Sequence, residues 1–215
     1  MRETLRGLPP FPDDLPDFDV RSAPGDPVSL FLDWFGAAVQ DQVPGPHAMT
    51  LATADAAGRV SSRVLICKDI DDGGRWYFAS SSDSGKGRDL AANRHAAASF
   101  WWPQHGRQIR IAGVAGSAGE QASADDFLAR PPASRAAALL GHQSETLDDL
   151  TALDQAFRRS QEVIEADPVL VAPDWTLYAL YAETVEFWQA DRQRRHVRLQ
   201  YQRDAGPWAK RLLWP

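Results

Sequence analysis

The stretch RVSSRVLICK, from Arg59 to Lys68, is the part of the sequence from which the fold is deduced. Its side chains alternate between two faces, one with Val60, Ser62, Val64 and Ile66 and the other with Ser61, Arg63, Leu65 and Cys67. A period of two residues predicts a β-strand whose faces meet different environments. Hydroxyl groups and a guanidinium on one strand, followed by a lysine, favour a groove that binds an anion. An ordinary strand with solvated charges is the alternative that this stretch alone leaves open.

The composition is that of a soluble globular protein. The 215 residues suit one domain with a sizeable core, and 44% of them are hydrophobic and 24% charged. The net charge of -6 argues against a broad nucleic-acid surface. No apolar run approaches the length of a membrane span, and the N-terminus carries no apolar signal segment. We therefore expect a cytoplasmic protein that binds neither nucleic acid nor a membrane.

Metal and nucleophile chemistry find little support. The single cysteine, Cys67, excludes an internal disulfide and leaves no cysteine cluster for a structural metal. The histidines show no metal-ligand spacing, and the serine-elbow motif GxSxG of hydrolases is missing. We expect no metal, and we interpret Cys67 as a buried strand residue. His196, between Arg195 and Arg198, is the one histidine we favour for chemistry.

The first 25 residues differ in composition from the rest of the chain. Residues 1–25 combine scattered charges with Pro9, Pro10, Pro12, Pro16 and Pro24, and so predict a flexible arm without a regular element of its own. Residues 26–215 are expected to form a single domain. It begins with Asp26-Pro27, an N-cap and a first-turn proline, which start a helix that ends before Pro44.

Short strands and then helices fill the rest of this domain. Strands are predicted at 48–54, 59–68, 75–80, 96–102 and 108–117, the last with bulges or bends at Gly113 and Gly116. Helices are predicted at 122–129, 134–140 and 147–166, with Asp148 and Asp149 in the first turn of the third. Further strands are predicted at 175–182, 186–189, 198–203 and 208–212. The pattern predicts a mainly β fold with flanking helices, arranged as an antiparallel barrel.

Cationic and hydrogen-bonding side chains gather at four places: Arg63 with Lys68, the loop Ser84–Arg88, Gln143 with Ser144, and the segment Arg194–Arg198. In the loop, two glycines let backbone N–H groups approach an anion, and Lys86 and Arg88 add positive charge where a helix begins. The GxxxxGK[ST] spacing of nucleotide-triphosphate loops is absent. A capped surface turn is the open alternative.

Taken together, these pieces resemble the pyridoxamine 5'-phosphate oxidase family. The resemblance covers roughly residues 27–215 and rests on motifs in the family's order: Arg63-Val-Leu-Ile-Cys-Lys68, Ser84-Gly-Lys86, Arg107-Gln108, Arg130-Pro131 with Ser134, Gln143-Ser144, and Phe187-Trp188-Gln189 with Arg194-Arg195-His196-Val197-Arg198. It implies an antiparallel split β-barrel homodimer that binds FMN in two clefts at the dimer interface. It also implies an oxidase that passes a hydride from its substrate to the flavin, which molecular oxygen then reoxidises.

The resemblance also assigns roles to individual residues. Arg63 and Lys86 would hold the FMN phosphate, a dianion that needs charged donors. The remaining flavin contacts would come from Val64, Leu65, Ile66, Cys67, Lys68, Ser80, Gln108, Gln143, Ser144, Trp188 and Arg198. The substrate would be bound by Lys68, Asp126, Arg130, Ser134, Arg194 and His196, of which Arg194 and His196 are the catalytic candidates.

Four positions depart from the vitamin-oxidising members of the family. Asp126 and Ala79 stand where those members have tyrosines, Gly85 where they have an arginine, and Val197 where they often have an aspartate. A carboxylate at position 126 would repel a substrate phosphate. Several of these departures resemble the phenazine-biosynthesis branch of the family, whose enzymes oxidise reduced tricyclic carboxylic acids that carry no phosphate.

These residues are compatible with three functions. The first is an FMN-dependent oxidase of a reduced phenazine carboxylic acid. The second is a pyridoxine/pyridoxamine 5'-phosphate oxidase, which Arg130, Ser134, Arg194 and His196 favour. The third is a flavin-binding split-barrel protein without turnover, which would have no need for Arg194 and His196.

Overall fold

The fold is built on one antiparallel sheet. The computed structural model describes residues 1–9 and 11–215, so Pro10, one of the prolines of the arm, lies outside the described residues. Within those ranges the strands are β1 Ala48–Ala54, β2 Val60–Ile66, β3 Asp69–Ile70, β4 Arg75–Ser81, β5 His95–Trp102, β6 Arg107–Ser117, β7 Trp175–Gln189, β8 Val197–Gln202 and β9 Ala209–Leu212. The sheet order is β2-β1-β5-β6-β7-β4-β3, and β8 and β9 join it through β7.

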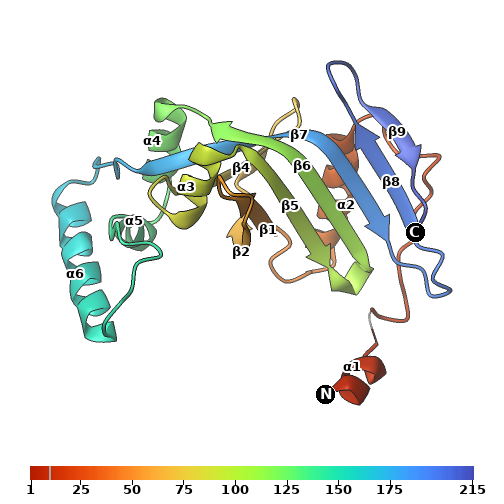
Figure 1. The fold of residues 1–215 in the computed structure, drawn as a ribbon, viewed down its shortest axis with the longest axis horizontal. Helices are drawn as coiled ribbons and strands as arrows, with labels where there is room; N and C mark the ends of the chain where they lie inside the picture. The colour runs from red at the N-terminus through yellow and green to blue at the C-terminus, as the bar shows by residue number, and fades with distance from the viewer. Residues whose placement is uncertain (10) are drawn as a thin grey trace.

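Strand β7 pairs with different strands along its two halves. Its first half pairs with β4 and its second half with β8, while β6 runs along its other edge (Figure 1). The two strands predicted at 175–182 and 186–189 are therefore one continuous strand. A register shift between Ala112 and Gly113 carries β6 past the extra residue of β7. The irregularity predicted at Gly113 is confirmed, but its extra residue, Glu183, belongs to β7; Gly113 lies opposite it, where a side chain would collide with the carbonyl of Tyr181.

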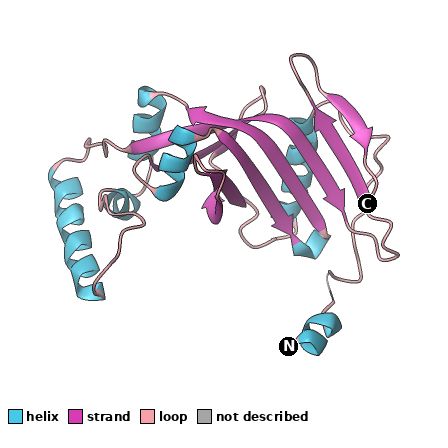
Figure 2. Ribbon diagram, in the orientation of Figure 1, coloured by secondary structure: helices cyan, strands magenta, loops and turns pink. Residues whose placement is uncertain are grey.

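The helices are α1 Arg2–Gly7, α2 Pro27–Gln40, α3 Gly85–Ala92, α4 Glu120–Leu128, α5 Pro132–Ala138 and α6 Leu150–Ala166, with a short 3-10 turn η1 at Pro103–His105. Helix α2 lies against one face of the sheet, and α3 to α6 gather at one end of it (Figure 2). The Asp26 side chain caps α2 by accepting from the Ser29 N–H, as predicted for that N-cap. The mainly β fold with flanking helices is thus confirmed.

Aromatic packing holds α2 on the sheet. Phe31 packs on Phe100 with 5.0 Å between ring centroids, and Trp34 packs on Phe187 with 5.2 Å. These side chains are at most 4% exposed, so each contributes about 1.5–3 kcal/mol of hydrophobic free energy to folding. Several of the eight tryptophans therefore serve the core.

The stretch around β2 differs from its prediction in two ways. The strand ends at Ile66, because the backbone turns at Cys67 and Lys68 to reach His47 and Tyr77. The predicted alternation therefore does not extend to Lys68. The face with valines and isoleucine is also the exposed one: Val60 is 73%, Val64 66% and Ile66 44% exposed. Within the described part of the chain, nothing covers these three apolar side chains.

The N-terminal arm contains a helix that its composition does not predict. The prolines begin only at residue 9, and the run Arg2–Gly7 before them forms α1, with Glu3 in the first turn and Arg6 in the last, where they suit the helix dipole. The end of the arm also packs on the body. The ring centroids of Phe18 and Trp34 lie 4.9 Å apart, and the Tyr201 hydroxyl donates to the carbonyl of Pro24.

Smaller corrections concern element ends. Helix α6 begins at Leu150 rather than 147, because Asp149 is its N-cap and accepts from the N–H groups of Thr151 and Ala152. Asp148 therefore precedes the helix. Strand β3, only two residues long, was not predicted. Within residues 1–9 and 11–215, no helix is both long enough and apolar enough to cross a membrane.

Candidate functional site

Lys86 is a buried cation held by neutral oxygens. Its ammonium donates to Ser80 Oγ at 2.8 Å, Ser84 Oγ at 3.1 Å and Gln143 Oε1 at 3.2 Å. Lys86 is only 6% exposed, and among the described residues no carboxylate lies within 4.0 Å of it. Burial, together with repulsion by neighbouring Arg63, lowers the pKa of Lys86 to about 8. A cation in this position can bind an anion without first releasing a carboxylate.

Helix α3 and the loop around Gln143 create this position. Ser84 caps α3 by accepting from the Gly87 N–H, and Gly87 has no room for a side chain because the Ser82 carbonyl lies against it. Gly85 leaves space that Ser144 borders, so the loop can approach the helix start. Arg88 does not join the cluster; its guanidinium turns outward and donates to the Asp83 carbonyl. The predicted anion loop thus contributes one cation, Lys86, rather than two.

Arg63 lies beside this cluster on β2. Its guanidinium donates to Thr53 Oγ1 at 2.9 Å and Ser61 Oγ at 2.6 Å, and Asp89 stands 4.0 Å away. Asp89 also accepts from both hydroxyls, at 2.7 Å from Thr53 and 3.1 Å from Ser61. Burial lowers the pKa of Arg63, and the nearby Asp89 carboxylate opposes that shift. Two cations and one carboxylate leave a local positive excess.

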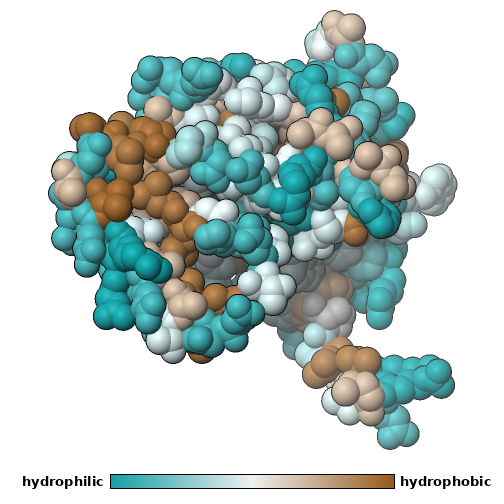
Figure 3. Space-filling model, turned by 60° about the vertical axis from the view of Figure 1, so that its left-hand side comes forward, coloured by the Kyte–Doolittle hydropathy of each residue, from teal (hydrophilic) through white to brown (hydrophobic). Residues whose placement is uncertain are grey.

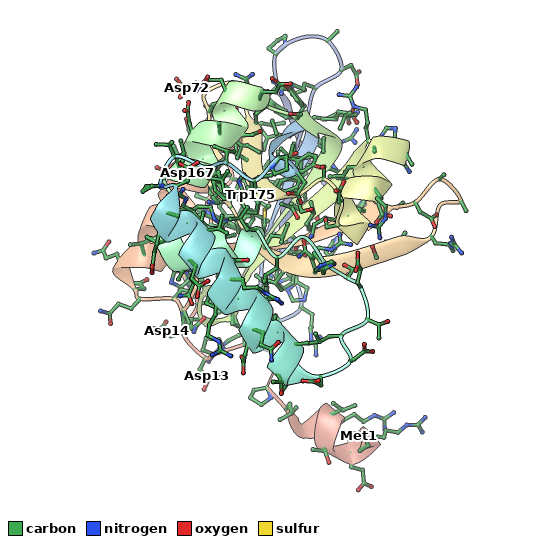
Figure 4. The ribbon with its side chains drawn as sticks, turned by 90° about the vertical axis from the view of Figure 1, so that its left-hand side faces the viewer. Met1, Asp13, Asp14, Asp72, Asp167 and Trp175 are labelled. Carbon is green, nitrogen blue, oxygen red and sulfur yellow. The ribbon has the colours of Figure 1, made fainter. Side chains whose placement is uncertain are left out.

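A cavity of about 760 Å³ opens next to Lys86. Leu65, Ala79 and Ser80 line it from the sheet, Arg130 from the turn between α4 and α5, and the loop around Gln143 and residues of α6 from the other side. Trp175 lies beside the C-terminal end of α6 in Figure 4 and also lines the cavity. Apolar residues border the hollow on this side of the molecule (Figure 3). The space suits a flat ligand with one anionic end.

The predicted substrate residues on this side form a linked group around Asp126. One oxygen of Asp126 lies 3.0 Å from Lys68 Nζ, and the other accepts from Trp175 Nε1 at 2.9 Å. Arg130 stacks on the Trp175 ring at 4.1 Å and donates to the Ser134 carbonyl. The negative charge of Asp126 is therefore balanced by the ammonium of Lys68, and Lys68 is already ion-paired.

A second group of predicted residues lies at the far end of β7. Trp101, Gln108, Trp188 and Arg198 form one row across β5, β6, β7 and β8, because each faces the next in the strand registers. His196 packs on Trp188 in a tilted arrangement, with 4.7 Å between ring centroids and 39° between ring planes, and its Nδ1 accepts from the Asp191 N–H. Arg194 lies exposed in the adjoining turn with φ of 65°.

Phe11 of the arm packs on this second group. Its ring lies 6.2 Å from that of His196 and 6.3 Å from that of Trp188. Asp13 adds an ion pair with Arg192 at 2.6 Å, although both side chains are largely exposed. The arm thus covers the candidate catalytic histidine in this conformation.

The two groups cannot meet within one chain. Trp175 belongs to the first and Trp188 to the second, and at about 3.3 Å per residue they are separated by roughly 40 Å along β7. Arg63, Lys68, Ser80, Lys86, Asp126, Arg130, Ser134, Gln143 and Ser144 lie at one end of the sheet, and Gln108, Trp188, Arg194, His196 and Arg198 at the other. The interpretation of Cys67 as a buried strand residue is wrong, because β2 ends at Ile66 and Cys67 lies between strands with its side chain only partly buried. Burial nevertheless raises the pKa of its thiol to about 12, which disfavours the reactive thiolate.

Several site residues were missed by the sequence analysis. Thr53 and Asp89 hold Arg63, Trp175 supports Asp126, Phe11 covers His196, and Glu186 binds Arg198. Only Glu186 has a local signal, since a carboxylate stands between Val185 and Phe187 in an apolar strand. The others depend on contacts between distant segments.

Comparisons with known proteins agree on one family. Residues 35–164 match the profile described as pyridoxamine 5'-phosphate oxidase, and residues 175–215 match the pyridoxine 5'-phosphate oxidase C-terminal dimerisation region. The pyridoxine/pyridoxamine 5'-phosphate oxidase of Pseudomonas paraeruginosa is 39% identical over 197 residues, which cover 90% of this chain and 91% of that protein. The protein of the same name from Janthinobacterium sp. is 38% identical over 192 residues, covering 88% and 90%.

Solved structures share the fold. PhzG from Burkholderia lata 383, in complex with tetrahydrophenazine-1-carboxylic acid, superposes with a TM-score of 0.86 at 31% identity, covering 94% of this chain and 99% of that one. A pyridoxamine 5'-phosphate oxidase-related, FMN binding protein from Nostoc punctiforme has a TM-score of 0.74 at 18% identity, covering 90% of this chain and 100% of that one, and shows the fold alone. The antiparallel split barrel is thereby confirmed, and the chain belongs to the pyridoxamine 5'-phosphate oxidase family.

Proposed function

We propose that the protein is a homodimeric, FMN-dependent oxidase of a reduced phenazine carboxylic acid. The observation that carries the choice of substrate is the ion pair between Lys68 and Asp126 at 3.0 Å. It lies among the residues that would otherwise hold a substrate phosphate. PhzG, a relative at 31% identity, was solved with tetrahydrophenazine-1-carboxylic acid, a ligand of the class proposed here.

The residues present fit FMN. Lys86 is a buried ammonium surrounded by hydroxyl and amide oxygens, and Arg63 adds a second cation beside it. A phosphate dianion at these two groups would complete the charge balance. As an edge strand, β2 leaves alternate backbone N–H and C=O groups unpaired along Val64–Ile66, where a flavin ring needs hydrogen bonds. When bound, the flavin would supply a two-electron acceptor for the substrate's hydride, with oxygen as the final acceptor.

The chain's own residues would bind and orient the substrate. The ring of Trp188, with His196 tilted against it, offers an aromatic contact surface for a flat substrate, and Arg194 is an exposed cation that can attract a carboxylate. Phe11 would exclude water from the histidine face. Arg194→Ala or His196→Ala is expected to lower turnover and leave the flavin bound.

The homodimer follows from three observations. The two groups of site residues lie at opposite ends of β7, the apolar face of β2 is uncovered, and residues 175–215 match a dimerisation region. A second copy that places its His196 end over the first copy's Lys86 end would complete two equivalent sites.

FMN affinity is expected to fall at alkaline pH because of Lys86. Its pKa of about 8 in the free protein means that the ammonium loses its proton above that pH, and a neutral amine does not attract a phosphate. Binding of the dianion raises the pKa, so complex formation above pH 8 takes up a proton and Kd rises by up to about tenfold per pH unit. Fluorescence titrations of FMN from pH 6.5 to 10 measure this.

The control is Lys86→Arg, because a guanidinium stays charged over this range. It is expected to bind FMN without the alkaline loss. An identical alkaline loss in both proteins would show that another group is responsible.

Substrate choice is tested by kcat/KM for a reduced phenazine carboxylic acid and for pyridoxine 5'-phosphate on the unmodified enzyme. The phenazine precursor is expected to be oxidised faster. Asp126→Asn releases Lys68, and Asp126→Tyr also adds a hydroxyl donor, so both are expected to raise kcat/KM for the vitamin phosphate, the tyrosine variant more. Asp125→Asn changes an exposed neighbour on α4 and is the matched control. It should leave kcat/KM for both substrates unchanged.

A second candidate, the vitamin B6 phosphate oxidase, is favoured by Arg130 beside Ser134 and by the names of the curated relatives. If the unmodified enzyme prefers the vitamin phosphate by about tenfold, or 1.4 kcal/mol, this second function replaces the first. A protein that binds FMN and turns over neither substrate would instead support the non-catalytic alternative.

A further inference from the structure

We propose that Glu186 is a positioning residue that fixes the guanidinium of Arg198 for its contact with the flavin. The inference rests on the proposed function, in which Arg198 touches the flavin. It adds a residue to which neither the motifs nor the relatives' names assign a role.

The carboxylate of Glu186 contacts two arginines, Arg198 and Arg110. Arg198 Nε donates to Glu186 Oε1 at 2.8 Å, and Arg198 Nη2 donates to Oε2 at 3.1 Å, so one edge of the guanidinium is held by two bonds. The third nitrogen, Nη1, donates to the Trp214 carbonyl at 2.9 Å. On the other side, Arg110 Nη1 lies 3.6 Å from Oε2. Hydrogen bonding to Glu186 raises the pKa of Arg198, so the guanidinium stays charged.

The place of Glu186 on the sheet explains the geometry. It points to the same face of β7 as Trp188, two residues further along, and Arg198 faces Trp188 across the ladder with β8. The Glu186 contact is therefore diagonal, and it turns one edge of the guanidinium along β7. The remaining N–H groups of Arg198 are left for the row that Gln108 and Trp188 share.

A merely stabilising ion pair is a weaker explanation. Glu186 is 7% exposed, so its charge is costly to bury, and buried ion pairs add little net stability. The bidentate contact does restrict the long side chain of Arg198, which is partly exposed and would otherwise occupy several rotamers. Fixing the donor before binding lowers the entropic cost of the flavin contact.

The test is a double-mutant cycle on FMN affinity, measured by flavin fluorescence and by the visible absorption of the bound flavin. Arg198→Ala is expected to weaken FMN about tenfold or more, and Glu186→Gln about fivefold. The double variant should bind no more weakly than Arg198→Ala alone, because Glu186 acts only through Arg198. Arg110→Ala, which touches the same carboxylate from its exposed side, is the matched control and should leave the affinity unchanged.

The outcomes separate this inference from the proposed function. An unmodified protein that does not bind FMN contradicts the proposed function itself. If Arg198→Ala weakens FMN and Glu186→Gln does not, or if the two effects add, the positioning role is wrong while the flavin site stands. If Glu186→Gln does not fold, Glu186→Asp replaces it, since it keeps the charge but is one methylene too short for the bidentate contact. Its affinity should fall between those of the unmodified protein and Arg198→Ala, and an unchanged affinity and spectrum would overturn the inference.

Discussion

Replacing Lys86 or Arg63 with alanine is expected to weaken FMN binding by about 1.5–3 kcal/mol each, roughly 10- to 150-fold. Both cations stand at the same end of the sheet, Lys86 on α3 and Arg63 on β2, and the pKa of Lys86 is lowered first by burial and then by repulsion from Arg63. A phosphate between them relieves that repulsion. Titration of the apoprotein with FMN, followed by flavin fluorescence, gives the two dissociation constants.

The Lys86→Ala variant is not expected to destabilise the protein without flavin. Lys86 is buried with neutral partners, so its removal deletes a poorly compensated charge and should leave the free energy of unfolding of the apoprotein unchanged or higher. Arg88→Ala, next to it on α3 but facing outward, is the control and should alter neither quantity. If the Lys86 and Arg63 variants bind FMN as well as the Arg88 variant does, the phosphate does not lie here.

Local patterns in the sequence predicted most of the strands and helices. The short β segments between turns predicted the ends of β1, β4, β5 and β6 to within a residue, and Asp26 with Pro27 predicted the start of α2. The wrong predictions occur where one interpretation was applied to a segment whose residues differ in structure. Prolines from residue 9 onward hid the helix α1 before them, and the polar interruption at Glu183 and Thr184 split a strand that is continuous because β6, β4 and β8 all pair with it.

The candidate site was less predictable, because its key contacts join distant segments. Lys86 meets Gln143 and Lys68 meets Asp126 only once α4 and the loop before α6 fold against the sheet. The sequence identified Asp126 as an unusual carboxylate but suggested free repulsion of a phosphate. The structure instead gives it a lysine partner, so its effect on substrate choice would act by occupying Lys68. The family resemblance predicted which residues belong to the site, and only the tertiary structure gives the contacts between them.

Two inactive variants are expected to restore activity when they share a dimer. One variant, Arg63→Ala with Lys86→Ala, lacks the cations at one end of β7. The other, Arg194→Ala with His196→Ala, lacks the candidate catalytic residues at the far end. In a symmetric dimer whose sites combine one end from each subunit, the mixed dimer has one site with all four changes and one with none. A pair of sites contained within single chains has no such intact site.

Turnover by the purified mixed dimer, co-expressed with two different affinity tags, tests most directly whether the sites are shared between subunits. The account predicts about half the kcat of the unmodified dimer, from parents that are each nearly inactive. Light scattering on the same samples should give a dimer for all three proteins. A mixed dimer as inactive as its parents, or a monomer that still binds FMN tightly, would contradict the account.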